Sequence, residues 1–386
     1  MLKRTPLFAA HQKLGGKLIE FGGWEMPVQY TSIMDEHHCV RRAAGLFDIS
    51  HMGEVLVGGP GAVDFLNGVL TNDLRKLEVG QGQYTLMCNE QGGVLDDLYA
   101  YRVGERDYCL IVNASRIEVD VAWLVAQWDK FPRRAIVKLE NVSAKAGAVA
   151  VQGPRVAEFV DACFPGPSQG GRSVARATEL KKNQVTRFES RGIPIWVART
   201  GYTGEDGFEV FTATGLIEQI WNKLLELGKP FGIKPTGLGA RDTLRTEMGY
   251  PLYGHELDEQ TTPIEAGLGR FVSLDKGEFI GRAVLAGQVA GGIKKQCVAF
   301  RMVDKSAPPR PQYPIWSTDG AAAPVGVVVS GTQSPSLNVG LGMGYVPPAV
   351  AKLGTRIDIE IRGKRFAAEV AAKPLYQRPP AGLPHR

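Results

Sequence analysis

The spacing of hydrophobic and polar residues divides most of the chain into short helices and short strands. Apolar residues at helical spacing, next to signals that start or stop a helix, mark residues 32–47, 60–70, 115–128, 154–163 and 214–228. Apolar runs bounded by Gly, Asn or Pro mark strands at residues 54–58, 83–89, 94–103, 107–113, 147–153, 194–200 and 208–211. Helices and strands do not alternate regularly, and Gly-containing turns join neighbouring strands. We therefore predict an antiparallel α+β fold rather than a doubly wound parallel sheet.

The helix starts are predicted from capping residues and prolines. Ser32 is a candidate cap for the first of these helices, and Ser115 with Glu118 forms a capping-box pattern. Pro60 and Pro154 occupy positions typical of the first helical turn. Each signal satisfies or removes a backbone N–H that would otherwise lack a partner at a helix start.

The pattern changes near residue 285. Residues 286–295, AGQVAGGIKK, are rich in Gly and Ala and look like a linker. Beyond them the chain is almost entirely short strands and turns with frequent Pro and Gly, which is typical of a small β-barrel or jelly roll. We predict one region over residues 1–285, with a further subdivision inside it, and a C-terminal β-barrel or jelly-roll-like domain over residues 290–386.

Composition indicates the class of protein and argues against several others. The chain has 386 residues, 44% hydrophobic and 22% charged, which suits a globular protein with a sizeable core. A net charge of +5 without a block of five like charges argues against a nucleic-acid tail. No apolar run approaches the ~18–20 residues that cross a bilayer, and no signal peptide is evident, so we expect no membrane association and a cytoplasmic location. Five widely spaced cysteines without a CxxC pair predict free thiols.

Two adjacent aspartates lie in the strand predicted at residues 94–103. Side chains alternate between the faces of a strand, so Asp97 shares a face with Tyr99 and Tyr101, whereas Asp96 lies on the opposite, otherwise apolar face. Aromatic surface suits a flat heteroaromatic ligand, and a carboxylate can orient such a ligand or accept a proton from its ring nitrogens. Asp96 is better interpreted as a structural acceptor for a turn or a helix N-terminus. The alternative, that both aspartates are simply solvated at a strand end, stays open at this point.

Two further segments carry candidate binding residues. Glu209 follows a loop dense in Gly and acidic residues, RTGYTGEDGFEV, and its carboxylate could accept two parallel hydrogen bonds from a donor–donor edge such as that of a pterin. Arg241 follows a Gly-rich stretch and, with Arg245 one helical turn later, could bind a carboxylate. The alternative for Glu209 is a solvated position on a strand. The alternative for the arginines is a surface ion pair with Asp242, Glu247 or another acid.

Other residues and motifs argue against several kinds of site. A catalytic role for His51 is a minor alternative. The side chains of His37, His38 and Cys39 diverge on a predicted helix, which argues against a metal site there. The sequence contains no G-x-G-x-x-G, P-loop, H-E-x-x-H or G-x-S-x-G motif, so it lacks these nucleotide-binding, metalloprotease and hydrolase signatures.

Several long motifs resemble those of a known family. They are RTPLFAAHQKLGGKLIEFGGWEMPVQYTSI, GLFDISHMGEV, TNDL, CNEQGGVLDDL, RTGYTGEDGFEV, GLGARDTLRTEMGYPLYGHEL and GEFIGRAVL. Together they resemble the aminomethyltransferase, or T-protein, family of the glycine cleavage system nearly from end to end. The resemblance implies a folate-binding α+β region over residues 1–285 and a C-terminal β-barrel.

The resemblance also implies a reaction and its partners. An aminomethyl group carried on the lipoyl arm of H-protein passes to tetrahydrofolate, which gives 5,10-methylenetetrahydrofolate, ammonia and dihydrolipoyl H-protein. Tetrahydrofolate is the co-substrate, and this chemistry needs no metal and no flavin. The expected partners are therefore lipoylated H-protein and a folate, with no nucleic acid and no membrane.

The resemblance assigns roles to individual residues. The family's essential aspartate falls on Asp97, its pterin-edge carboxylate on Glu209 and its folate-contacting arginine on Arg241. Arg378, in KPLYQR, matches a segment that closes over the folate tail. The positions that match the lining of the folate pocket are Tyr84, Tyr101, Asn113, Tyr202 and Met52. One departure is Tyr99, which adds bulk next to Asp97 where many relatives have an aliphatic residue.

Two other functions would suit a related fold. One is folate-dependent demethylation, as in sarcosine and dimethylglycine dehydrogenases, but those chains need a flavin domain that this sequence lacks. The other is a folate-binding module without transferase activity, such as an iron–sulfur assembly factor, but the KGCxxGQE-like motif of that group is absent from the sequence. Asp97, Glu209 and Arg241 together favour an enzyme.

Overall fold

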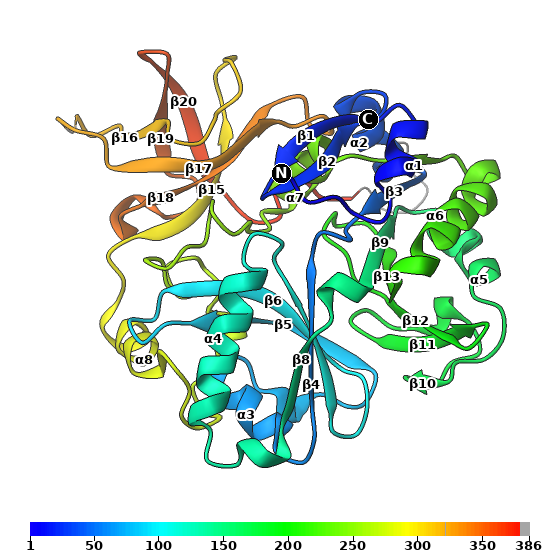
Figure 1. Ribbon diagram of the computed structural model, residues 1–386. Helices are drawn as coiled ribbons and strands as arrows, with labels where there is room; N and C mark the ends of the chain where they lie inside the picture. Colours follow the sequence, from blue (N-terminus) through cyan, green and yellow to red (C-terminus); the bar gives the residue numbers. More distant parts are fainter. Residues whose placement is uncertain (321, 379–386) are drawn as a thin grey trace. The chain divides into compact units, whose positions relative to one another are not determined.

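The computed structural model describes residues 1–320 and 322–378, and the chain forms two compact units. The first unit comprises Met1–Met87, Asp96–Arg241 and Asp275–Ile280. The second comprises Cys88–Leu95, Asp242–Leu274 and the described chain from Gly281 onward. Each unit is therefore assembled from separate stretches of the sequence (Figure 1).

Two large sheets form the frame of the first unit (Figure 1). The five-stranded sheet has the order β5 (Gln81–Cys88), β6 (Val94–Arg102), β7 (Asp107–Val112), β4 (Gly53–Gly58) and β8 (Lys138–Asn141). The seven-stranded sheet has the order β10 (Gly170–Gly171), β11 (Val185–Ser190), β12 (Ile193–Ala198), β13 (Gly207–Ala213), β9 (Ala146–Gln152), β3 (Ala44–Asp48) and β14 (Ile233–Pro235). In the seven-stranded sheet as described, β14 pairs with β3 in parallel and the other pairs are antiparallel.

Helices and a small hairpin complete this part of the chain. The helices are α1 (Phe8–Lys13), α2 (Ile33–Arg42), α3 (Ala62–Val69), α4 (Ile117–Lys130), α5 (Val160–Cys163), α6 (Thr214–Gly228) and α7 (Leu238–Met248). The hairpin consists of β1 (Lys17–Phe21) and β2 (Trp24–Gln29). Short 3-10 turns lie in both units, at Leu74–Lys76, Arg134–Ile136, Ser143–Lys145, Val156–Glu158, Ala177–Glu179 and Lys229–Phe231 of the first and at Gly269–Phe271 and Pro348–Val350 of the second.

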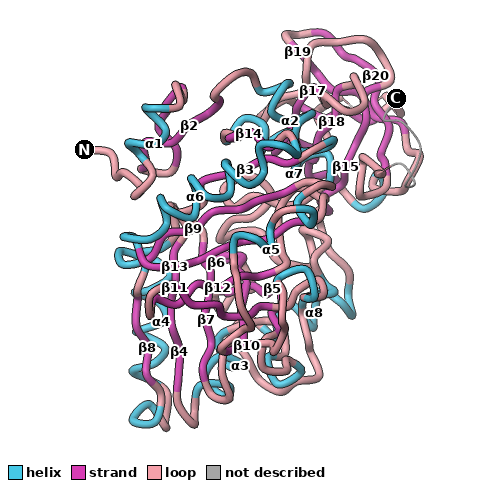
Figure 2. The backbone as a smooth tube through the Cα atoms, turned by 90° about the vertical axis from the view of Figure 1, so that its right-hand side faces the viewer, coloured by secondary structure: helices cyan, strands magenta, loops and turns pink. Residues whose placement is uncertain are grey.

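Helix α6 shows how the sequence places a helix on a sheet. Its buried residues Ile217, Ile220, Trp221 and Leu224 recur at spacings of three and four, so they share one face. That face packs against β9 and β13 and belongs to the core cluster of the seven-stranded sheet (Figure 2). Burying each such side chain contributes about 1.5–3 kcal/mol. The helix therefore anchors the strand that carries Glu209.

The second unit contains a closed six-stranded barrel. Its order is β15 (Gln296–Met302), β18 (Gly340–Val346), β17 (Gly326–Gln333), β16 (Pro314–Ser317), β19 (Arg356–Ile361) and β20 (Lys364–Ala371), and helix α8 (Arg282–Gly291) precedes it in the chain. β19 reads RIDIEI, and the period of two turns Ile357, Ile359 and Ile361 into the barrel core. The prediction of an α+β region followed by a C-terminal β-barrel is confirmed.

The predicted strands are all present, with ends that differ by at most two residues. The predicted linker at residues 286–295 is wrong, because α8 covers most of it. Its Ala residues favour a helix, Leu285 is buried, and Gly281 and Gly292 take positive φ at its two ends.

The predicted helix starts are less accurate. Ser32 does cap α2, since its side chain accepts a hydrogen bond from Asp35 N at 3.1 Å. The capping box at residues 115–118 is wrong: Arg116 is the N-cap of α4, and Glu118 instead forms an ion pair with Lys3 at 2.8 Å. The predicted helix at residues 154–163 is broken into a 3-10 turn and the four-residue α5.

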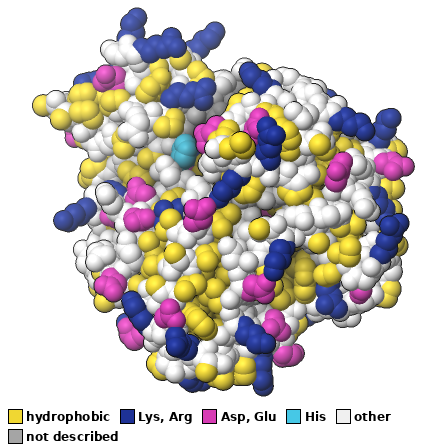
Figure 3. Space-filling view, viewed as in Figure 1, with side chains coloured by type: hydrophobic (Ala, Val, Ile, Leu, Met, Phe, Trp, Pro, Cys, Tyr) yellow, Lys and Arg dark blue, Asp and Glu magenta, His cyan; other side chains and the backbone are white. Residues whose placement is uncertain are grey.

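Three further observations concern surface charge, helix length and the cysteines. Figure 3 shows Lys and Arg side chains gathered over the barrel strands, and the exposed basic residues there are Arg301, Arg356, Arg362, Lys364 and Arg365. In the described part of the chain, no helix combines the length and apolar character needed to cross a membrane. All five cysteines are free, as predicted.

Candidate active site

Strand β6 separates its two aspartates as the side-chain alternation predicts. Asp96 is fully buried, whereas Asp97 is half-buried on the face that also presents Tyr99 and Tyr101. The two tyrosine rings lie 4.9 Å apart between centroids. A carboxylate therefore stands beside an aromatic surface, which is the arrangement expected for a flat heteroaromatic ligand.

Two hydrogen bonds hold the Asp97 carboxylate. Tyr84 Oη, from β5, donates to Asp97 Oδ2 at 2.8 Å, and Asn113 Nδ2 donates to Asp97 Oδ1 at 3.0 Å. Burial and then the negative charge of Asp96 raise the pKa of Asp97 to about 7, although both hydrogen bonds act to lower it. The solvated strand end considered as an alternative is therefore wrong for Asp97, which can take up and release a proton near neutral pH.

Asp96 serves the turn that leads into α4. It accepts hydrogen bonds from Asn113 N and Asn113 Nδ2, both at 2.9 Å. Asn113 thus bridges the two aspartates. The interpretation of Asp96 as a structural acceptor for a turn agrees with this geometry.

Glu209 lies on β13, in the seven-stranded sheet, and is linked to the Asp97 face through Thr200. Thr200 Oγ1 donates to Glu209 Oε2 at 2.6 Å, and Tyr101 Oη lies 2.9 Å from Thr200 Oγ1. The rings of Tyr101 and Phe211 are 6.3 Å apart. Burial raises the pKa of Glu209, and burial followed by the charge of Glu209 raises the pKa of Tyr101. Glu209 is half-buried, and through Thr200 it is linked to Tyr101 on the aromatic face of β6.

Arg241, on α7, is half-buried beside Tyr202. Its guanidinium carbon lies 4.8 Å from the centre of the Tyr202 ring, a cation–π contact. Arg241 Nη1 is buried without a hydrogen-bond partner among the described residues. Burial lowers the pKa of Arg241, and the charge of Glu209 opposes that change. A buried guanidinium N–H without a partner is suited to an acceptor on a ligand.

The loop that carries Tyr202 is fixed by buried side chains. Gln152 Nε2 donates to Thr200 O at 3.0 Å, and Thr203 Oγ1 donates to Gln152 Oε1 at 3.0 Å. Arg41 Nη1 donates to Thr203 O at 2.7 Å. A Cβ on Gly201 would come within 1.8 Å of Gln152 Oε1, so any larger residue there would displace this hydrogen-bonded side chain.

Three further residues considered from the sequence are Met52, Arg378 and His51. Met52 is half-buried just before β4. Arg378 is exposed and belongs to the second unit, so its predicted contact with the folate tail stays a prediction. His51 is buried with its ring 5.8 Å from that of Phe21, and burial lowers its pKa to about 4, so it is neutral at physiological pH.

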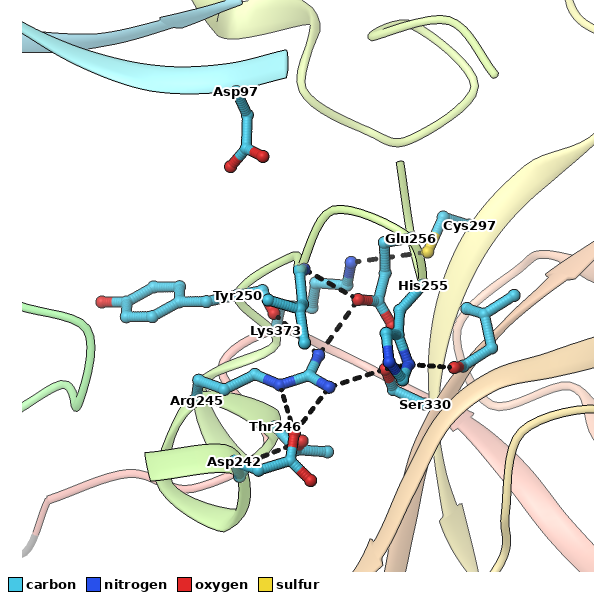
Figure 4. A network of polar contacts seen from close by, with 12 residues as sticks. Asp97, Asp242, Arg245, Thr246, Tyr250, His255, Glu256, Cys297, Ser330 and Lys373 are labelled. Carbon is cyan, nitrogen blue, oxygen red and sulfur yellow. Dashed lines mark hydrogen bonds and ion pairs between the residues drawn. The ribbon is translucent and has the colours of Figure 1, made fainter. Parts of the chain in front are cut away.

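Arg245 serves a different purpose from Arg241, one helical turn away. It is buried and forms ion pairs with Asp242 at 2.7 Å and Glu256 at 3.0 Å, and Arg245 Nη2 donates to Ser330 Oγ at 2.9 Å (Figure 4). His255 Nδ1 lies 2.9 Å from Val329 O on the same strand, β17. These contacts fix the C-terminal half of α7 within the second unit. Arg245 therefore has a structural role.

No group of three or more His, Cys, Asp or Glu side chains in the described chain could hold a metal ion. The sequence raised the question of a metal site at His37, His38 and Cys39. There, Cys39 Sγ donates to Ala44 O at 3.0 Å. The rings of His37 and His38 meet at 86° and 5.6 Å. The expectation that neither metal nor flavin takes part in the reaction stays a prediction.

Known proteins match this chain over nearly its whole length. The model of the GCVT N-terminal domain matches residues 7–276, and that of the glycine cleavage T-protein C-terminal barrel domain matches residues 295–377. An aminomethyltransferase of Bacillus pumilus (strain SAFR-032) is 44% identical over 379 residues, which are 98% of this chain and 100% of that protein. One of Bacillus cereus (strain AH187) is 44% identical over 382 residues, 98% and 99% of the two chains.

A solved structure agrees with these matches. The crystal structure of the glycine cleavage system aminomethyltransferase T from Bartonella henselae has a TM-score of 0.88 and 34% identity, over 98% of this chain and 99% of that one. The chain belongs to the glycine cleavage T-protein family. Its activity is therefore the aminomethyl transfer to tetrahydrofolate of glycine cleavage. The comparisons therefore favour aminomethyl transfer over the two alternative functions that a related fold would allow.

Sequence reasoning missed several residues of this T-protein site. Thr200 links Tyr101 to Glu209, and Gln152 and Arg41 hold the Tyr202 loop. Burial and then the charge of Asp96 raise the pKa of Asp120, on α4, to about 10. These residues come from segments far apart in the sequence, so no local spacing reveals them. The sequence offered one hint of this link: Thr200, which can both donate and accept a hydrogen bond, directly precedes GYTGED.

Proposed function

We propose that Asp97 is the proton acceptor of the aminomethyl transfer. The observation that carries this proposal is a half-buried carboxylate on the aromatic face of β6, held through one oxygen by Tyr84 and through the other by Asn113. Such hydrogen bonds fix the orientation of the carboxylate. A pKa of about 7 suits a group that accepts and returns a proton at neutral pH.

The chemistry explains why one such group is sufficient. One nitrogen of tetrahydrofolate attacks the transferred carbon and loses a proton, and a second nitrogen then closes the five-membered ring. The C–S and C–N bonds of the aminomethyl-lipoyl group break, and the two protons leave on the thiol and on ammonia, so no oxidant or reductant is consumed. Asp97 carries a proton between these groups, and its negative charge stabilises an iminium-like intermediate. Most of the remaining barrier is lowered by positioning.

Recognition of the folate is assigned to residues around this carboxylate. Glu209 has lone pairs beyond the one used by Thr200, and it accepts two parallel N–H bonds from the pterin edge. Arg241 donates its unpartnered Nη1 to a folate oxygen, supported by the ring of Tyr202. Tyr101 and Met52 line the pocket. Arg378 binds the folate tail.

The transferred group arrives on another protein. The family acts with H-protein and a folate, and we propose that the lipoyl arm of H-protein presents the aminomethyl carbon to Asp97. We also propose that the chain works in the cytoplasm without a metal or a flavin, and that its domains span residues 1–285 and 290–386.

The proposed function is tested by product formation from purified components. 5,10-Methylenetetrahydrofolate should form when aminomethylated, lipoylated H-protein and tetrahydrofolate are both present, and a chelator should leave the rate unchanged. The same rate with H-protein lacking its lipoyl group would contradict the proposal. A crystal structure with a reduced folate would test separately whether Glu209 and Arg241 contact the pterin.

A further inference from the structure

Glu54 on β4 is a buried acid that the proposed function does not use. It is 3% exposed, and neither Oε1 nor Oε2 has a hydrogen-bond partner among the described residues. Its backbone, in contrast, is held on both sides. Glu54 N donates to Ser143 Oγ at 2.9 Å, and Val142 N donates to Glu54 O at 2.9 Å. A buried carboxyl group on a fixed strand without a partner is suited to a ligand that supplies the missing donors.

The pairing of the strands places Glu54 on the face that carries Asp97. Tyr99 of β6 pairs with Ile111 of β7, and Ile111 pairs with Glu54 of β4 (Figure 2). Directly paired residues point to the same face of a sheet, and Asp97 shares that face with Tyr99 because it lies two residues away. Two strand spacings of ~4.8 Å and a two-residue step of ~6.8 Å separate the Cα atoms of Glu54 and Asp97 by roughly 12 Å. The two carboxyl groups therefore border the same aromatic surface.

The charge of Glu54 favours a small cation as its ligand. Burial alone raises the pKa of Glu54 to about 8, and no positive charge of the described chain opposes this effect. The group is therefore mostly a neutral acid at neutral pH. Once ionised, it is a buried charge that needs a cation as its partner. In the proposed reaction, the amino group that leaves the transferred carbon can become an ammonium ion, whereas the N–H groups of the pterin edge carry no charge.

We propose that Glu54 binds the ammonia that leaves the transferred carbon and holds it as an ammonium ion on the Asp97 face of the five-stranded sheet. The inference rests on the proposed function, because it requires the aminomethyl group to react beside Asp97. Ammonia is released when its bond to the transferred carbon breaks. It then takes the proton of the Glu54 carboxylic acid, because an amine is the stronger base, and an ammonium–carboxylate pair forms. The proton returns to Glu54 when ammonia departs, so the step consumes no oxidant, reductant or net proton.

The first test detects the ion pair in the folate-free protein. Infrared spectra are recorded at neutral pH with ammonium chloride, at concentrations that saturate the reverse reaction, and with sodium chloride at the same ionic strength. Ammonium should remove the carbonyl band of a carboxylic acid from the wild-type spectrum and add carboxylate bands, and Glu54→Gln should show neither change. A wild-type spectrum that ammonium leaves unchanged would overturn the proposal.

The second test separates ammonia binding from folate binding. The reverse reaction consumes 5,10-methylenetetrahydrofolate, ammonia and dihydrolipoyl H-protein, so each has its own KM. Glu54→Gln should raise the KM for ammonia about tenfold or more and the KM for 5,10-methylenetetrahydrofolate less than about threefold. An unchanged KM for ammonia, or a larger effect on the folate KM, would refute an ammonium site.

A matched control lies on the neighbouring strand. Glu140 of β8 is exposed and pairs with Lys145 at 3.0 Å, so Glu140→Gln makes the same chemical change at a solvated carboxylate. This variant should behave as the wild type does in both tests. If Glu54→Gln does not fold, Glu54→Leu replaces it, because an apolar side chain suits a buried position.

Failure of the proposed function would give a different result. Near-normal transfer by Asp97→Asn would remove Asp97 as the proton acceptor, yet the infrared change caused by ammonium would persist in that variant. Absence of the infrared change, together with the expected defect of Asp97→Asn, would instead remove only the ammonium site.

Discussion

The acid strength of Asp97 results from opposing effects of its immediate neighbours. Burial and the charge of Asp96 disfavour the carboxylate, whereas the hydrogen bonds from Tyr84 and Asn113 favour it. The balance leaves the pKa at about 7. Removing the charge of Asp96 should therefore lower the pKa of Asp97, and removing a hydrogen bond from Tyr84 or Asn113 should raise it.

Asp97→Asn should lower the rate of aminomethyl transfer by about 10²–10⁴-fold, the range for loss of a general base. The amide keeps the shape of the side chain but accepts no proton, so the folate Kd should change less than about tenfold. Single-turnover kinetics and folate titration measure the two quantities. Asp96→Asn is the matched comparison: it disturbs a fully buried acceptor, so it should lower Tm more than Asp97→Asn does.

Tyr84→Phe should move the acidic limb of the rate profile to higher pH by roughly one unit. The acidic limb reports protonation of Asp97, and the lost hydrogen bond is one that lowers the Asp97 pKa, so its removal raises that pKa. Tyr99→Phe removes a hydroxyl from the Asp97 face of β6 and should leave the limb in place. A shift of the Tyr84→Phe profile to lower pH would refute the assigned role of this contact.

Glu209→Gln should raise the folate Kd about tenfold or more, with a smaller effect on single-turnover rate. The glutamine amide presents N–H groups to a pterin edge that itself donates, so one hydrogen bond is lost and a donor is left facing a donor. The same substitution at the exposed Glu218 on α6 is the control, and it should leave the Kd unchanged. Equal affinities of the two variants would place the pterin elsewhere.

At the scale of helices and strands, local patterns predicted what depends on local contacts. The period of two along residues 94–103 identified β6 and separated its faces correctly, because alternation is a property of the strand itself. The start of α4 was predicted wrongly, because Glu118 pairs with Lys3 from the N-terminal segment instead of folding back on its own helix. The link from Tyr101 through Thr200 to Glu209 could not be predicted, since it depends on how the two sheets pack.

Lys276 shows how a distant residue completes a helix. Lys276 Nζ, in a buried side chain, donates to Asn67 O at 2.7 Å and Asn72 O at 3.0 Å, and also to Leu70 O, so it satisfies carbonyl groups at the C-terminal end of α3. Lys276→Met keeps the apolar stem but leaves these carbonyls without the donor. We expect the free energy of unfolding in urea to fall by about 1–3 kcal/mol. Lys130→Met, at an exposed position, should change it little.

At the scale of the whole molecule, the two units should respond differently to a ligand. A folate analogue at about 100 times its Kd stabilises what it binds by about 2.7 kcal/mol. Hydrogen exchange should therefore slow in β6 and β13 of the first unit, while β17 and β19 of the barrel keep their rates. Protection of residues 371–378 would support the proposed contact of Arg378, and unchanged exchange there would remove Arg378 from the site.

The closed barrel limits how another protein can be recognised at the second unit. Each of the six described strands already pairs with two neighbours, so these strands offer no open edge to which an incoming chain could add a strand. Any protein that docks on the barrel must therefore be selected by side chains, and the basic residues on β19 and β20 make that selection sensitive to ionic strength.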